Sequence, residues 1–458
     1  MGAAGTDVAI ESADMAFMHE RRPALLMRAD IDWEDTKQEM MQYLKKMIQI
    51  DTSVGRHGET VAAYYIRTVL EANELSATVR EPIPGRGSLI YHKPGQVSNQ
   101  ALLLLSHLDV APAKDLSDWR HLPFSGDDEA GEIWGRGAID CKGLVVVWLM
   151  LVLLIQRTKI PLQRGLVFAA TADEESGGRW GVEWLLKHTD DFQECRYALN
   201  EGGGFSFRQQ TRDLYTCQYA EKGHLILNYR MGIANSTDCH FKSQQVSIYP
   251  KDSNVMNPML KALFRIRNFP SAFVSLLPYG GKVALLKRFS SLPLDYNTLL
   301  NNIIEVEPLL SVDGSYSDIR VHMYLLPGES ILELEQKIIK QRLILPEFVT
   351  DMRVVSSVEP SSSPLDTPLY RSIVSTMNRQ QGRNTELLPF ITPGATDSRH
   401  LRTKGIVSYG FFPTPPETDI RLIHRANERI SADALVFALQ RLYKIVIRFL
   451  TSDDFISS

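Results

Sequence analysis

Three near-continuous apolar segments place the strongest constraint on how this chain folds. ALLLLSHLDV at Ala101–Val110 and GLVFAATAD at Gly165–Asp173 have the length of β-strands, whereas GLVVVWLMLVLLI at Gly143–Ile155 has the length of a helix. A strand that is apolar along its whole length is typical of a sheet covered on both faces. The succession of strand, buried helix and strand therefore predicts a layered α/β fold.

Several classes of partner and compartment are excluded by simple features. The apolar segment Gly143–Ile155 is shorter than the roughly 20 residues that cross a bilayer, so no membrane partner is expected. The net charge is −4 and Lys and Arg are scattered along the sequence, so the sequence gives no sign of a basic surface that binds nucleic acid. The four cysteines are too few for a disulfide framework, and the N-terminus lacks the pattern of a secretory signal. We therefore expect a cytoplasmic protein.

The length of 458 residues favours two domains. Near Glu221 the pattern changes to short alternating strands mixed with helices, and the Ser/Pro-rich segment Glu359–Pro368 is typical of a linker. We expect residues 1–220 and 358–458 to form the α/β domain. Residues 221–357 are expected to form a smaller α+β domain inserted into it.

Acidic and histidine side chains gather where strands are expected to end, and active sites of open α/β sheets collect beyond the carboxyl ends of strands. Carboxylates and imidazoles suit zinc or a similar divalent ion, and one carboxylate can bridge two ions. Each cluster alone also fits a structural histidine, a helix cap or an ordinary turn. Their joint placement favours a metal site. The candidates are His107, Asp109, Asp140, Glu174, Glu175, Glu201 and His424.

The order of these clusters resembles the aminoacylase and glutamate-carboxypeptidase family of co-catalytic zinc hydrolases. The resemblance covers roughly Trp33–Tyr219 and Ser357–Leu450. The phrases that carry it are SHLDV, WGRGAIDCKG, TADEESGG, NEGGG, PGATDSRHL and IHRANERI.

The resemblance implies a zinc-exopeptidase-like catalytic domain and two divalent ions per chain, with Zn²⁺ first and Co²⁺ or Mn²⁺ as alternatives. It implies that His107 and Glu201 hold the first ion, that Asp140 bridges both, and that Glu175 and His424 complete the second site.

The resemblance also implies roles for three residues that bind no metal. Glu174 would be the general base that deprotonates a metal-bridging water. The carboxylate of Asp109 would orient the imidazole of His107. Arg399 would bind the carboxylate of the substrate, and a surface arginine is the alternative interpretation.

The inserted domain matches the family less well. Family lids carry a histidine that reaches the oxyanion, often from a partner subunit. His240 is the nearest candidate, without the flanking glycine and proline, whereas His224 comes too early in the chain. The resemblance still implies a homodimer formed through the inserted lid domain.

The leading hypothesis is hydrolysis of an N-acyl amino acid or short peptide next to a free carboxylate. A dipeptidase or aminopeptidase on the same metal site is the alternative, because the metal site is shared and selectivity lies in the lid. A non-catalytic binding protein on the same fold is the third hypothesis.

Overall fold

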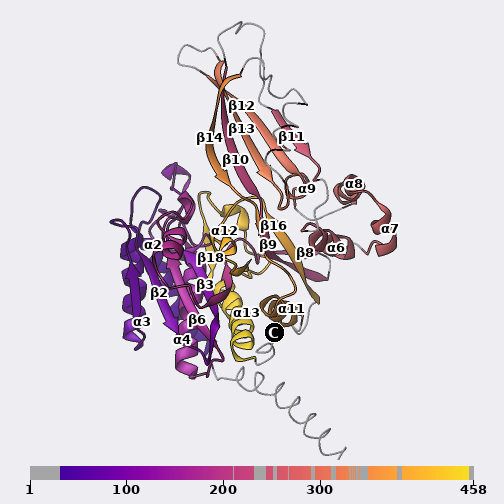
Figure 1. Ribbon diagram of the computed structural model, residues 1–458. Helices are drawn as coiled ribbons and strands as arrows, with labels where there is room; N and C mark the ends of the chain where they lie inside the picture. The colour runs from indigo at the N-terminus through magenta and orange to yellow at the C-terminus, as the bar shows by residue number, and fades with distance from the viewer. Residues whose placement is uncertain are drawn as a thin grey trace, which may run out of the picture. The chain divides into compact units, whose positions relative to one another are not determined.

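The computed structural model (Figure 1) describes residues 31–452 except 210, 232–243, 251–254, 267, 290–293, 311–315, 330–331, 333, 335, 337–339, 341–348 and 379–383. His240 lies outside the described residues. Within the described part, none of the helices combines the length and apolar character that a bilayer span requires.

Two compact units divide the chain. The first comprises Met1–Tyr215, Leu365–Leu387 and Lys404–Ser458, and the second comprises Thr216–Pro364 and Leu388–Thr403. Each unit is therefore built from segments that are distant in the sequence. The second unit takes one segment, Leu388–Thr403, from beyond the Ser/Pro-rich stretch.

The first unit is built on a mixed sheet whose central strands are parallel. Parallel pairing joins β6 to β3, β3 to β7, and β7 to β17, whereas β2 runs antiparallel to β6 and β1 antiparallel to β2. The order is β1 (Ala77–Arg80), β2 (Ser88–Lys93), β6 (Arg164–Thr171), β3 (Val97–His107), β7 (Cys195–Asn200) and β17 (Val407–Gly410). Because β6, β3 and β7 are parallel, the residues that follow them meet at one edge of the sheet.

Helices cover this sheet. The apolar segment expected to be a buried helix is α4 (Lys142–Thr158), in which every residue from Lys142 to Ile155 is buried, so that prediction is confirmed. It packs against β3 and β6 and against the helices α2, α3 and α13. The remaining bounds are α2 (Trp33–Gln49), α3 (Glu59–Ala72), α5 (Val182–His188), α11 (Pro368–Asn378) and α13 (Ala432–Thr451).

A small antiparallel sheet and a short hairpin complete the first unit. The small sheet has the order β18 (Arg429–Ser431), β5 (Glu132–Trp134) and β4 (Asp128–Glu129). The hairpin pairs β8 (Ser206–Gln209) with the beginning of β9 (Arg212–Glu221).

The second unit contains a five-stranded antiparallel sheet. Its order is β11 (Gln244–Ile248), β12 (Asn302–Leu310), β13 (Tyr316–Leu325), β10 (Gly223–Met231) and β14 (Val349–Val358). Leu225, Leu227, Val321, Met323 and Ile304 alternate along these strands and build an apolar core on one face. Together the two units confirm a mixed α/β fold.

Further elements of the second unit are short. The end of β9 pairs with β15 (Ser361–Ser362), and β16 (Asn384–Thr392) leads toward α12. The described helices are α6 (Asn257–Ile266), α7 (Ser271–Leu276), α8 (Tyr279–Phe289), α9 (Tyr296–Leu300) and α12 (Ser398–Thr403).

Candidate metal centre

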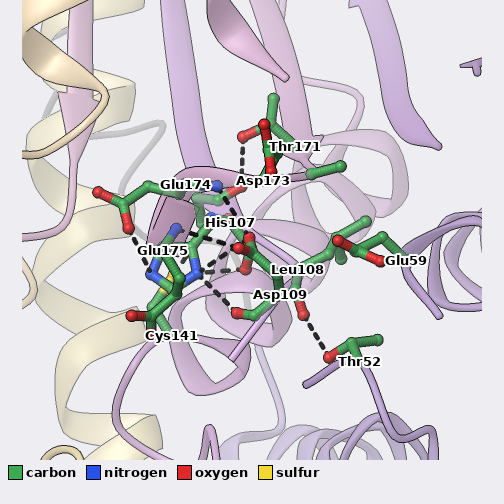
Figure 2. Close-up of polar contacts among 12 residues, drawn as sticks. Thr52, Glu59, His107, Leu108, Asp109, Cys141, Thr171, Asp173, Glu174 and Glu175 are labelled. Carbon is green, nitrogen blue, oxygen red and sulfur yellow. Dashed lines mark hydrogen bonds and ion pairs between the residues drawn. The ribbon is translucent and has the colours of Figure 1, made fainter. Parts of the chain in front are cut away.

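Three neighbouring strands of the first unit deliver candidate side chains to the same edge of the sheet. His107 is the last residue of β3 and pairs with Thr171, the last residue of β6. A short 3₁₀ turn of Glu174–Ser176 follows β6, and Glu201 directly follows β7. Figure 2 shows His107, Glu174 and Glu175 side by side. The parallel sheet thus explains why residues far apart in sequence meet.

Asp140 lies between two histidines. Its Oδ1 is 3.1 Å from Nε2 of His107, and its Oδ2 is 3.0 Å from Nε2 of His424. Each carboxylate oxygen therefore faces a different imidazole. This is the arrangement expected of a carboxylate shared by two ions.

The two adjacent glutamates make different contacts. Glu175 Oε1 is 3.0 Å from His424 Nε2, the same nitrogen that faces Asp140. Glu174 Oε2 lies 4.0 Å from His107 Nε2, and its side chain is only 12% exposed. Glu175 thus belongs with His424 and Asp140, whereas Glu174 lies on the His107 side.

Asp109 holds this site through both its backbone and its side chain. Its carbonyl oxygen is 2.8 Å from Nδ1 of His107, whereas its carboxylate oxygen is 3.7 Å away. Because a carbonyl only accepts, Nδ1 carries the proton and Nε2 is the nitrogen that faces Asp140. The Asp109 carboxylate accepts from the backbone N–H groups of Glu174 and Glu175, at 3.1 and 3.0 Å. Burial raises the pKa of Asp109 to about 7.

Two groups of potential ligand atoms emerge, each with all atoms within 4.8 Å of one another. One contains His107, Asp140 and Cys141, and the other contains Asp140, Glu175 and His424. Among the described residues, the groups that meet this distance do not include Glu201. Burial raises the pKa of Cys141 to about 12, and the nearby charges of Asp140 and Glu201 add to that effect. Glu201 follows β7, which pairs with β3, the strand that ends in His107.

Cys141 was not among the candidates, although it directly follows Asp140. Its sulfur accepts from the backbone N–H of His107 at 3.2 Å and donates to the His107 carbonyl at 3.4 Å. Its high pKa keeps the thiol protonated near neutral pH. These contacts show a structural role for Cys141 in holding His107 against the Asp140 loop.

The carboxylates of the site are ionised opposite imidazoles whose basicity they raise. Burial opposes the charge of Asp140, but hydrogen bonds from His107 and His424 outweigh it and hold its pKa well below the usual range. Hydrogen bonds to Asp140 and Glu175 raise the pKa of His424 to about 10. A divalent ion substitutes for protons in such a site, because ligands must be deprotonated to bind.

The geometry of these donors fits divalent ions. Ligand atoms around one tetrahedral zinc, each about 2.0–2.1 Å from it, lie about 3.3 Å apart. The distances from Asp140 to the two histidines, 3.1 and 3.0 Å, are close to that separation. The donor set of imidazoles and carboxylates is the one that zinc and related ions prefer.

The remaining candidates belong to the second unit. Arg399 is the second residue of α12, is partly buried, and donates its backbone N–H to the carbonyl of Thr396. His224, on β10, stacks on Tyr324 and lies 3.3 Å from His322, nitrogen to nitrogen. A role of either residue in binding a substrate stays a prediction.

Comparison with known proteins identifies the family. The model of peptidase family M20/M25/M40 matches residues 103–448, a segment that contains all the candidate residues named above for the metal centre. The N-fatty-acyl-amino acid synthase/hydrolase PM20D1 of Bos taurus is 26% identical over 471 residues, covering 91% of this chain and 88% of the relative. Aminoacylase-1 of Mus musculus is 26% identical over 367 residues, covering 78% of this chain and 82% of the relative.

A solved structure shares the fold. The M20 family metallo-carboxypeptidase Sso-CP2 from Sulfolobus solfataricus superposes with a TM-score of 0.62 at 15% identity, covering 90% of this chain and 99% of that one. The family resemblance inferred from the motifs is confirmed, and so is the prediction of a hydrolytic enzyme. The chain belongs to peptidase family M20/M25/M40.

Proposed function

We propose that this enzyme is a dinuclear zinc hydrolase that cleaves the amide bond of an N-acyl amino acid, or the last peptide bond of a short peptide, beside a free carboxylate. The observation that carries the proposal is the position of Asp140, which presents one oxygen to His107 and the other to His424. A single carboxylate placed in this way is suited to two ions a few ångströms apart.

His107 and Glu201 are proposed to hold one ion, Glu175 and His424 the other, and Asp140 both. When bound, the ions polarise the scissile carbonyl and lower the pKa of water. The Nδ1–H···O=C bond from His107 to Asp109 fixes the tautomer that leaves Nε2 for a metal. The Asp109 carboxylate, bonded to the N–H groups of Glu174 and Glu175, holds the turn that carries both glutamates.

Glu174 is proposed to take the proton from the attacking water and deliver it to the leaving amine. Its carboxylate lies 4.0 Å from His107 Nε2, within the site, and its side chain is largely buried. A carboxylate next to the proposed metal positions is suited to proton transfer. This assignment separates the role of Glu174 from that of Glu175.

One alternative to an N-acyl amino acid hydrolase or carboxypeptidase is proposed for the substrate class. A dipeptidase or aminopeptidase uses the same metal site, and the choice depends on whether the enzyme recognises a free carboxylate or a free amino group. The similarity to aminoacylase-1 and PM20D1 supports the carboxylate hypothesis. Arg399 is the residue proposed to bind that carboxylate, because a planar guanidinium makes two parallel hydrogen bonds.

The second unit is proposed as a lid and as the surface of a cytoplasmic homodimer. Its edge strand β14 carries three exposed apolar side chains, Met352, Val354 and Val355. An edge strand of this kind is a surface for pairing with another strand. A second copy of the chain is the proposed partner.

Two divalent ions are expected per chain. Protein purified without chelator and reconstituted with Zn²⁺ is expected to show a metal-to-chain ratio of two by elemental analysis, because Asp140 is shared. The control is the same preparation after chelation and dialysis. A ratio that never exceeds one would contradict the bridging role of Asp140.

Arg399→Lys is expected to raise KM for substrates with a free carboxylate by about tenfold, with unchanged metal content. Lysine keeps the charge but loses the two-pronged geometry, and hydrogen bonds to charged groups contribute about 1.5–3 kcal/mol. Steady-state kinetics on an N-acyl amino acid measure the change.

An amidated version of the same substrate serves as the control for Arg399. The wild-type enzyme is expected to cleave it poorly. Equal cleavage of the free and amidated substrates would overturn the carboxylate requirement and favour the dipeptidase or aminopeptidase alternative.

A further inference from the structure

A buried ion pair connects the two loops that carry Asp140 and His424. Arg136 precedes Asp140 by four residues, and Glu428 follows His424 by four. Arg136 Nη1 donates to Glu428 Oε2 at 2.7 Å, and the two side chains are 2% and 0% exposed. Neither residue was among the candidates from the sequence.

Each member of the pair also binds the backbone of the opposite loop. Glu428 Oε1 accepts from the N–H groups of Ile139 and Asp140, at 2.9 and 3.1 Å. Arg136 Nη1 donates to the carbonyl of Arg425, the residue after His424, at 3.2 Å. The contacts are reciprocal, so the ion pair fixes the position of Asp140 relative to His424.

Stability alone gives a weak reason for such a pair. Burying two charges costs several kcal/mol of desolvation per ion, and apolar pairs of similar volume often stabilise a protein equally well. The two loops are also joined independently, because β18 pairs with β5 and Gly135 donates its N–H to the Glu428 carbonyl at 2.9 Å. The ion pair adds a defined distance between the parts of the two loops that carry Asp140 and His424.

We propose that Arg136 and Glu428 are positioning residues that set the spacing between Asp140 and His424. In this way they determine the affinity for the ion held by Asp140, Glu175 and His424. The inference rests on the proposed function, since it requires that ion to bind. The ion on the His107 side shares only Asp140 with these loops, so it is affected less.

The main test is the double variant Arg136→Met/Glu428→Leu, which removes the ion pair and its bonds to the opposite loop and leaves neither charge of the pair without its partner. Calorimetric titration of the chelator-treated protein with Zn²⁺ is expected to show a 10–100-fold rise in the Kd of one ion. The Kd of the other ion is expected to change less. A milder double variant, Arg136→Met/Glu428→Gln, keeps an amide oxygen for the two N–H groups and is expected to show a smaller rise.

Two matched variants separate positioning from general destabilisation. Arg136→Lys is expected to bind both ions as the wild type does, because both bonds of Arg136 come from one nitrogen and an ammonium can make both. Arg164→Met removes another buried arginine, which donates to the carbonyls of Phe449 and Ser452 at the start of β6, at the opposite end of that strand from the site. It is expected to lower the thermal stability while both ions stay bound.

The outcomes distinguish this inference from the proposed function. If a folded double variant of either kind binds both ions with wild-type affinity, the positioning role is overturned and the proposed function stands. If Arg164→Met weakens the same ion as strongly, general destabilisation explains the effect and the inference falls. A wild-type protein that binds fewer than two ions would overturn the proposed function, and this inference with it.

Discussion

Glu174→Gln is expected to lower kcat by about 10²–10⁴-fold and to leave both ions bound. Glutamine has nearly the shape of glutamate but cannot accept the proton of the attacking water. Glu174 is not one of the proposed metal ligands, so its replacement is expected to remove none of them. Steady-state kinetics on an N-acyl amino acid and elemental analysis of the same sample measure the two effects.

Glu175→Gln is the matched control, because it makes the same chemical change one residue later. It is expected to weaken the ion shared with His424, and its activity is expected to return at high Zn²⁺ concentration. If both variants lose metal equally, and Glu174→Gln also regains activity at high Zn²⁺, the assignment of Glu174 as the base is wrong.

The meeting of distant side chains at one edge of the sheet follows from patterns visible in the sequence. The segment Ala101–Val110 is apolar enough to be a covered strand, and so is Gly165–Asp173. Both are strands in the structure, and they are parallel neighbours with His107 opposite Thr171. Once covered strands are recognised, the polar residues at their ends are predicted to converge.

The contacts that hold these side chains in place were not predictable in the same way. Glu428 binds Arg136 across 292 residues of sequence, and no periodicity links the two positions. Arg136 lies between two glycines, and this position in the sequence does not identify Glu428 as its partner. Asp109 is a related case, because spacing cannot show which oxygen of a residue faces an imidazole. Its carbonyl, not its carboxylate, is the atom nearer to Nδ1 of His107.

Asp140→Asn is expected to reduce bound metal to one ion or fewer per chain and to lower kcat by at least about 10³-fold. Asn offers one acceptor oxygen, and its amide nitrogen would face the other histidine, so the residue can no longer serve two ions. Metal ions contribute several kcal/mol to transition-state stabilisation, and each 1.36 kcal/mol corresponds to a tenfold change in rate. Elemental analysis and kinetics at saturating Zn²⁺ measure the two losses.

Asp191→Asn is the matched control for Asp140, because it makes the same change at another largely buried aspartate of the first unit. Asp191 binds Arg80 through two hydrogen bonds at 3.0 and 3.2 Å, and it precedes the start of β7, whereas Glu201 follows the end of that strand. This control is expected to lower the thermal stability slightly, with both ions retained and kcat near that of the wild type. The shared-ligand role of Asp140 is excluded if Asp140→Asn still binds two ions as tightly as the wild type. Equal metal loss in both variants would instead trace the effect to a disturbed fold, because only Asp140 lies between the two histidines.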